Sequence, residues 1–187
     1  MHRAIPAITR LTRGLTLIEL LIGVALAGIL LAQAAPSFQT WLARSRLLAQ
    51  TSALTSSLSY AKSEAVRRGV RVTVCKSSAP GAVTPACSIG GSWSAGWLVF
   101  VDNTQVAGNL AGTVDGTDML LRIGEPLQDA ITSADASLAN WIAFTPDGLA
   151  VASGGTSVGT ITICQGSTGR TVTLNTIGRT STASTTC

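Results

Sequence analysis

The chain has 187 residues, which suffices for one modest globular domain with an additional element and excludes two large domains. Hydrophobic residues make up 46% of it and charged residues 12%, with a formal net charge of +4. Three of the 13 basic residues, Arg3, Arg10 and Arg13, precede the first apolar run, and the other 10 nearly balance the 9 acidic residues. This balance excludes a generally basic nucleic-acid-binding protein.

The first predicted element is a transmembrane helix over residues 15–36, because the run from Leu15 to Ala35 contains one charged residue, Glu19. About 20 apolar residues, at a rise of 1.5 Å each, span the roughly 30 Å hydrocarbon core of a bilayer. Residues 1–14 are predicted to be a removable leader, whose arginines favour an inside location and place the following chain outside. The alternative is a secretory signal cleaved after Ala34, although the apolar part of such signals is usually about 7–15 residues long.

An amphipathic helix is predicted over residues 37–69, directly after Pro36. Its apolar residues recur mostly at helical spacings and are expected to pack on a head domain: Phe38, Trp41, Leu47, Leu54, Leu58, Ala61 and Ala65. Gly69 suits the left-handed cap that ends many helices, and Arg67 and Arg68 are favourable in a last turn. One long helix, half in lipid and half on the head, accounts for both segments.

Residues 70–187 are predicted to form a β-rich head. Six segments have the alternating or apolar pattern of strands: Val70–Val74, Gly96–Asp102, Met119–Ile123, Trp141–Phe144, Thr160–Ile163 and Arg170–Leu174. A turn is expected at residues 145–148, and residues 166–169 are expected to close a hairpin. With the helix packed on these strands, the expected fold class is α+β.

The four cysteines all follow the apolar run: Cys75, Cys87, Cys164 and Cys187. Their spacing contains no C-x-x-C pair and no histidine lies near them, which argues against a zinc site. Disulfide bonds are therefore expected, in an oxidising compartment such as the bacterial periplasm. Of the three possible connectivities we favour the pairing of neighbours, in which each closed loop stabilises the head by roughly 3 kcal/mol.

The N-terminal segment Arg13–Leu21, R-G-L-T-L-I-E-L-L, resembles the prepilin peptidase motif of type IV pilins and type II secretion pseudopilins. The resemblance implies cleavage after Gly14, methylation of the new amine on Leu15, and a role in assembly for Glu19. Pro36 lies where many pilins carry a helix-kinking proline. In a filament core, Glu19 can pair with the terminal amine of an adjacent subunit, which offsets its burial; a glutamate without a partner is the alternative.

Further resemblances narrow the family. Gly96–Asp102, G-W-L-V-F-V-D, is similar to a segment of the GspH/FimT family of minor pilins and pseudopilins, and Gly169-Arg170 and Ile177–Arg179 resemble its C-terminal pattern. The family implies a type IV pilin-like fold, with a long N-terminal helix packed on an antiparallel β-sheet head. It also implies a single-pass bacterial inner-membrane protein with a periplasmic head, which assembles into a type IV pilus or a type II secretion pseudopilus. Implied partners are other pilin subunits, the prepilin peptidase and membrane lipid.

The residue inventory argues against an enzyme, and no cofactor or metal is expected. The only histidine, His2, lies in the leader, so the mature chain lacks histidine bases and ligands. Neither a G-x-S-x-G elbow nor the G-K-[ST] of a phosphate loop occurs. Asp102, Asp115 and Asp118 flank a glycine-rich loop and offer oxygen ligands for calcium, but their spacing is not that of an EF-hand, and a solvated loop is the favoured interpretation.

Arg170 and Arg179 are the only charged residues after Asp147. A flexible, polar, positive tail can contact DNA phosphates without reading bases. Some FimT-like proteins are associated with DNA uptake through a segment resembling G-R-x-R, whereas here Gly178-Arg179 is followed by Thr180-Ser181. A DNA-contacting tip module is therefore the alternative function, against a hairpin surface that merely lacks acids.

Overall fold

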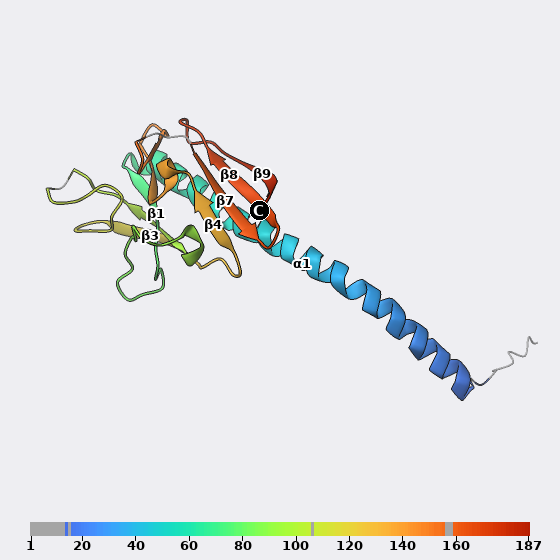
Figure 1. Cartoon of the computed structure of the whole chain (residues 1–187). Coiled ribbons are helices and arrows are strands. Elements are labelled where there is room, and N and C mark those ends of the chain that lie inside the picture. The colour runs from blue at the N-terminus through green and yellow to red at the C-terminus, as the bar shows by residue number, and fades with distance from the viewer. Residues whose placement is uncertain (1–13, 15, 106, 156–158) are drawn as a thin grey trace, which may run out of the picture. The chain divides into compact units, whose positions relative to one another are not determined.

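The computed structural model describes residues 14, 16–105, 107–155 and 159–187, without the side chains of residues 31–37. The chain divides into two compact units, Met1–Leu42 and Ala43–Cys187. One long helix, α1 (Leu17–Arg68), contributes residues to both units, and the described strands all belong to the second (Figure 1).

Helix α1 ends at Arg68, one residue before the expected cap. Gly69 adopts a positive φ of 67°, and its N–H donates to the carbonyl of Ala65 at 3.0 Å. The buried stripe of the helix consists of Leu47, Leu54, Leu58, Ala61 and Ala65. The expectation that Phe38 and Trp41 belong to this stripe is wrong, because both are exposed and their rings stack on each other, 5.8 Å apart. Helical spacing alone does not mark where a stripe begins to contact strands.

The head contains two antiparallel sheets (Figure 1). The five-stranded sheet has the order β3-β2-β1-β5-β6 and comprises β1 (Val72–Lys76), β2 (Trp97–Val101), β3 (Met119–Gly124), β5 (Trp141–Phe144) and β6 (Ala150–Ala152). The four-stranded sheet has the order β4-β7-β8-β9 and comprises β4 (Ile131–Ala134), β7 (Gly159–Gln165), β8 (Thr168–Leu174) and β9 (Thr180–Thr186). Two short 3₁₀ helices, Trp93–Ala95 and Ala136–Leu138, connect strands.

Both sheets and the stripe of α1 share one hydrophobic core. In β7 and β8 burial alternates along the strand, so that Ile161, Ile163, Val172 and Leu174 face the core. Strand β1 instead is buried at every position, because loops cover the other face of its sheet and a second apolar cluster forms around Phe100. The described core residues thus join α1 to strands of both sheets in one folded head, to which β9 is attached through its pairing with β8.

All six predicted strands occur: Trp141–Phe144 has the predicted bounds, and the other five have shifted ends. The hairpin turn at Gly166 and Ser167 is shorter than expected. Strands β4, β6 and β9 were not predicted. The suggestion of a flexible tail after Asp147 is wrong: this segment contains four strands, β6 to β9, and β9 pairs along its length with β8. Threonine favours extended backbone, and the disulfide at Cys187 holds the end of this strand in place.

Candidate assembly site and surface of the head

Helix α1 begins with a side-chain cap from Thr16. The hydroxyl oxygen of Thr16 accepts a hydrogen bond from the N–H of Glu19 at 3.3 Å, and the Thr16 carbonyl accepts from the N–H of Leu20 at 3.2 Å. Threonine followed three residues later by glutamate is the sequence signature of this cap. A carboxylate in the first turn also interacts favourably with the positive end of the helix dipole. Glu19 is therefore suited to the helix start apart from any role in assembly.

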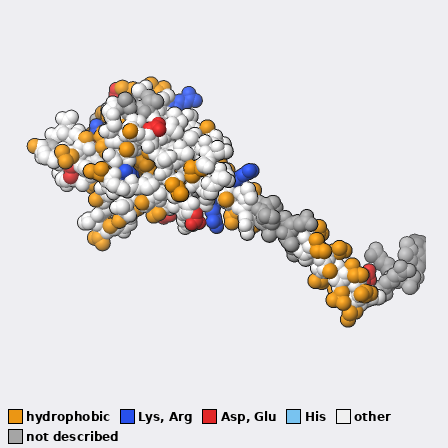
Figure 2. Space-filling model, viewed as in Figure 1, with side chains coloured by type: hydrophobic (Ala, Val, Ile, Leu, Met, Phe, Trp, Pro, Cys, Tyr) orange, Lys and Arg blue, Asp and Glu red, His pale blue; other side chains and the backbone are white. Residues whose placement is uncertain are grey.

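The first unit exposes a large apolar surface (Figure 2). Side chains 53–77% exposed follow one another along the helix: Leu17, Ile18, Leu20, Leu21, Ile22, Val24, Leu26, Ile29 and Leu30. Monomeric soluble proteins rarely present so continuous an apolar patch, which marks a surface for protein or membrane contact. Within the described part of the chain, no helix combines the length and the hydropathy needed to cross a membrane.

Several predicted site residues fall outside this description. Residues 1–13 and Leu15 are not among the described residues, so the leader and the methylated amine stay predictions. Gly14 is described and exposed. The backbone of α1 is helical through Pro36, whose side chain belongs to the undescribed range 31–37, and the kink expected there stays a prediction.

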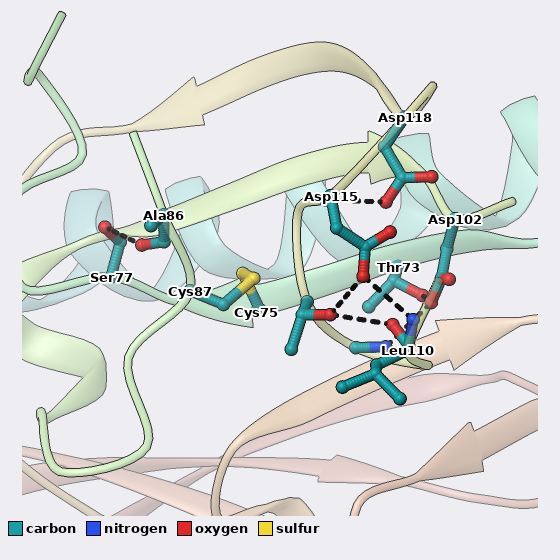
Figure 3. Close-up of a disulfide and its surroundings, with 11 residues drawn as sticks. Thr73, Cys75, Ser77, Ala86, Cys87, Asp102, Leu110, Asp115 and Asp118 are labelled. Atoms are coloured by element: carbon teal, nitrogen blue, oxygen red, sulfur yellow. Dashed lines mark hydrogen bonds between the residues drawn. A yellow bond between two sulfur atoms is a disulfide. The ribbon is translucent and has the colours of Figure 1, made fainter. Parts of the chain in front are cut away.

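The first disulfide joins Cys75 in β1 to Cys87 in the following loop, with their Cα atoms 5.6 Å apart (Figure 3). Two hydrogen bonds reinforce this junction: the hydroxyl of Ser77 donates to the carbonyl of Ala86 at 2.7 Å, and the N–H of Ser88 donates to the carbonyl of Lys76 at 2.9 Å. The glycine- and serine-rich loop is thereby tied to the central strand of the larger sheet.

The second disulfide joins Cys164 in β7 to Cys187 and crosses the intervening strand β8, completing the neighbour pairing. It passes over Gly169, where an added Cβ atom would lie 2.3 Å from the sulfur of Cys187. Only glycine leaves room for this crossing. The disulfide therefore connects two strands that are not adjacent in their sheet.

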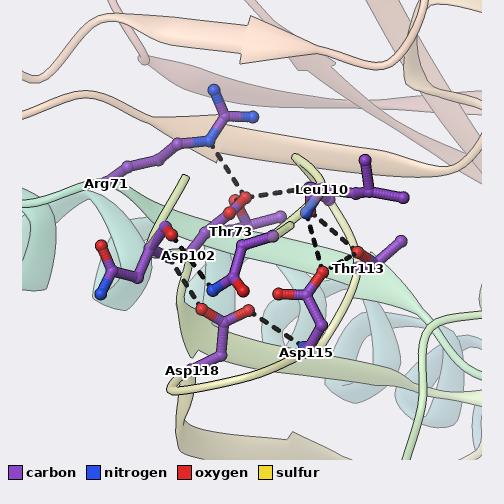
Figure 4. Close-up of polar contacts among 10 residues, drawn as sticks. Arg71, Thr73, Asp102, Leu110, Thr113, Asp115 and Asp118 are labelled. Carbon is purple, nitrogen blue, oxygen red and sulfur yellow. Dashed lines mark hydrogen bonds and ion pairs between the residues drawn. The ribbon is translucent and has the colours of Figure 1, made fainter. Parts of the chain in front are cut away.

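A buried ion pair between Arg71, just before β1, and Asp102, just after β2, lies at the end of the larger sheet away from the first disulfide (Figure 4). The carboxylate of Asp102, 2% exposed, accepts from the Nε of Arg71 at 3.1 Å, from the hydroxyl of Thr73 at 2.6 Å and from the N–H of Gly112 at 2.9 Å. The Arg71 guanidinium also lies 4.9 Å from the ring centre of Trp141. Asp102 thus joins strand β1, the end of β2 and the long loop that follows.

The other two aspartates of the calcium hypothesis also form hydrogen bonds within this loop. Asp115 accepts from the N–H of Leu110 and the hydroxyl of Thr113, both at 2.8 Å, and Asp118 accepts from the N–H of Asn103 at 2.8 Å. Burial raises the pKa of Asp118. The described residues contain no group of three potential ligands placed to hold a metal ion. The carboxylates order the loop by accepting its N–H groups.

The structure does not bring Arg170 and Arg179 together. Arg179 lines a groove of about 710 Å³ with Lys62 and Arg67 of α1, and the Lys62 ammonium donates to the carbonyl of Ile177 at 2.7 Å. Arg170 lies at a separate hollow beside Arg44. Arg170 lies within β8, whereas Arg179 lies in the turn between β8 and β9, so the two residues line different hollows.

Comparison with known proteins decides the family. The profile described as type II transport protein GspH matches residues 50–178, well over half of the chain. The chain belongs to the GspH family. A second profile, the prokaryotic N-terminal methylation motif, matches residues 9–32. No curated protein matches the chain.

Two crystal structures of the type IV minor pilin FimU of Pseudomonas aeruginosa strain PAO1 have a similar fold. The form in space group P21 is 21% identical and covers 74% of this chain and 88% of its own, with a TM-score of 0.50. The form in space group P65 is 20% identical, with 73% and 92% coverage and a TM-score of 0.50. The expected pilin-like α+β fold is confirmed.

Family and fold are those of structural pilins, so the chain is a GspH-type minor pilin or pseudopilin that assembles with other pilin subunits. The methylation motif and the family indicate a membrane-anchored component of a pilus or pseudopilus. Two features of the site escaped the sequence analysis. The cap from Thr16 was readable from the spacing of Thr16 and Glu19, whereas the pair of Arg71 and Asp102, 31 residues apart, has no local signal.

Proposed function

We propose that this GspH-family chain is a non-enzymatic subunit made as a single-pass precursor in the bacterial inner membrane, with its head in the periplasm. The prepilin peptidase removes residues 1–14, the new amine of Leu15 is methylated, and the subunit then joins the tip region of a type IV pilus or a type II secretion pseudopilus. The observation that carries this proposal is the methylation-motif match over residues 9–32, which spans the cleavage point directly before α1.

Assembly is proposed to use the apolar first unit and Glu19. When the subunit leaves the lipid, the exposed apolar side chains from Leu17 to Leu30 must be buried against another apolar surface. In a filament core, the helices of neighbouring subunits provide this surface. Gly23 and Gly28 have no heavy atom within 4 Å of an added Cβ, which leaves space for close approach of a second helix. Glu19 would pair with the amine of a neighbour and so fix the register between the two helices.

The N-terminal residue and the intact mass of the protein from membranes of its native host test this proposal. A chain that starts at methylated Leu15 is the expected result. Gly14→Val should leave the leader uncut, because the added side chain occupies the cleavage position, whereas Gly23→Ala should be processed normally. A soluble chain that starts at Ala35 would contradict the proposal and would instead indicate a secretory signal cleaved after Ala34.

DNA contact is a second, weaker candidate, and the comparisons give it no support. The observation in its favour is the groove where Arg179 lies with Lys62, since two cations beside each other can contact adjacent phosphates. DNA retention that falls steeply with salt and is abolished by replacing both residues with alanine would support it. Retention unaffected by that replacement would remove it.

A further inference from the structure

The sheets of the head have four edges, and three of them are protected against pairing with another chain. Free edges promote such pairing, and proteins block them with short strands, charges, bulges and proline. Strand β6 has three residues, and β4 has four and lies between Asp129 and Asp135. Strand β3 contains Arg122, pairs with β2 through a register shift, and is followed by Pro126.

Strand β9 has none of these protections. Its seven residues, T-S-T-A-S-T-T, include no charge and no proline, and it pairs in regular register with β8 along its whole length. Within the described chain it is the last strand of its sheet, and residues 181–184 are exposed. The disulfide from Cys187 to Cys164 fixes its end against β7. A seven-residue, uncharged edge is thus attached to the sheet along its length and tied at its C-terminal end by a disulfide.

The hydrogen-bond pattern identifies the groups that this edge offers. The N–H of Cys187 donates to the carbonyl of Ser167 at 3.2 Å, so these two residues form a hydrogen-bonded pair. Such pairs alternate along an antiparallel ladder. Residues 181, 183 and 185 therefore direct their backbone groups toward β8. Residues 180, 182, 184 and 186 direct theirs outward, where an added strand can pair with them.

Two hollows between β9 and α1 lie where alternate side chains of an added strand would point. Both are lined by Leu48, which is 48% exposed, and by Arg170; the larger, about 290 Å³, also includes Arg44 and Ser184, and the smaller, about 160 Å³, includes Thr182. In recognition by strand addition, backbone bonds supply affinity and such pockets select side chains.

The charge in these hollows is not balanced. The Nη2 of Arg170 donates to the hydroxyl oxygen of Thr182 at 3.3 Å, while its Nε is buried without a hydrogen-bond partner among the described residues. In the same part of the chain neither Arg170 nor Arg44 forms an ion pair. A buried N–H donor beside a second cation fits a carboxylate.

We propose that the outer edge of β9 binds an extended strand of a different pilin-type subunit, and that a carboxylate side chain of this strand enters the hollow to pair with Arg170 and Arg44. A second copy of this chain is a poorer occupant, because β9 has no acidic residue and a β9–β9 pair would leave Arg170 without a carboxylate. The inference rests on the proposed function insofar as the partner is another subunit of the same filament.

Photo-cross-linking of the full chain in membranes of its native host tests this docking surface. The photoreactive residue replaces Ala183, which is exposed and points to the face of the sheet opposite Arg170. In the matched control it replaces Ile131, which is exposed on the opposite edge of the same sheet. A third position, Ile22 in the first unit, reports assembly through helices. We expect adducts with another pilin subunit from positions 183 and 22, and none from position 131.

The outcomes separate the two proposals. Adducts from Ile22 without any from Ala183 would overturn the docking surface and leave the proposed function standing. Absence of adducts at both positions would count against both. An adduct at position 183 that contains a second copy of this chain would overturn the choice of occupant. Adducts from Ile131 equal to those from Ala183 would overturn the assignment of the docking surface to β9.

Two pairs of variants then test the chemistry of the contact. Ser184→Pro removes an outward N–H, whereas Ser184→Ala keeps it, so only the proline variant should lose the adduct at position 183, by at least about tenfold. Arg170→Gln should reduce the adduct at position 183 by a similar factor. Arg170→Lys, which retains the charge, should keep more of this adduct than Arg170→Gln. Thermal unfolding shows whether each variant folds. If Ser184→Pro does not fold, the comparison of Arg170→Gln with Arg170→Lys decides. Equal amounts of the position-183 adduct in these two variants would overturn the proposal.

Discussion

At the residue scale, Asp102 connects strand β1 to the long loop after β2 through its bonds with Thr73 and Gly112. Asp102→Asn removes the charge that balances Arg71 while keeping the shape of the side chain. We expect the free energy of unfolding to fall by roughly 2–3 kcal/mol, because an uncompensated guanidinium remains partly buried. Denaturant unfolding of the full chain in detergent measures this change.

The matched control for that substitution is Asp129→Asn. Asp129 is exposed and has a positive φ of 53°, a conformation that asparagine also tolerates. A change within about 0.5 kcal/mol is expected. Equal losses in the two variants would mean that the pairing of Asp102 with Arg71 contributes nothing specific.

A second residue-scale prediction concerns pH and Glu64. Hydrogen bonds from Arg67 and Arg68 lower the pKa of Glu64 from 4.5 to about 2. Because the folded pKa lies below the unfolded one, the contribution of Glu64 to stability is present above pH 4.5 and is lost as the pH falls toward 2. Denaturation at a series of pH values should therefore show a smaller acid loss for Glu64→Gln than for the unmodified chain.

The control for the pH series is Glu125→Gln, since Glu125 is exposed and forms no ion pair among the described residues. Its profile should follow that of the unmodified chain. If Glu64→Gln also follows it, the interaction with the two arginines does not stabilise the folded state.

At the scale of elements, the crossing of β8 by the second disulfide predicts a specific defect. In Gly169→Ala the added Cβ would meet the sulfur of Cys187 and also Thr185, so the disulfide should form incompletely. Alkylation followed by intact mass should detect free thiols in this variant. Gly81→Ala, where no heavy atom lies within 4 Å of the added Cβ, should stay fully oxidised. Full oxidation of both variants would contradict the account.

The elements also show how far the sequence could predict the fold. Strands such as β2 and β8 carry a strong local pattern, and the helix end at Gly69 has a recognised cap signal. Strand β9 carries no apolar residue except Ala183, so its conformation depends on pairing with β8 and on a covalent bond to β7. Strand β4 is short and contains an exposed Ile131, and only its partner β7 defines it.

The candidate site was predictable to a similar extent. The apolar helix and Glu19 are local features and were recognised, together with the family. The separation of Arg170 from Arg179 was not, because it depends on how β8 and β9 lie against α1. The ladder of β9 and the hollows beside it likewise arise only after strands distant in sequence have paired.

At the scale of the whole head, the shared core predicts one unfolding transition. Residues of α1, the five-stranded sheet and the four-stranded sheet share the larger buried cluster, and the second cluster, around Phe100, contains only three buried residues. Unfolding of either sheet would therefore expose the core of the other. Far-UV circular dichroism and tryptophan fluorescence, dominated in the head by the buried Trp93 and Trp97, should change at the same denaturant concentration. Two separate midpoints would show that the sheets unfold independently.

The strand order also has a consequence for how the head folds. Most neighbours in the sheets are consecutive along the chain, and the two disulfides span only 12 and 23 residues. The pairing of β1 with β5 instead joins Val72 to Phe144, and β4 reaches β7 only past the β5–β6 hairpin. Long chain closures of this kind are the slow events of folding. We therefore expect the docking of β5 onto β1 to limit the rate at which the head refolds when both disulfides are intact.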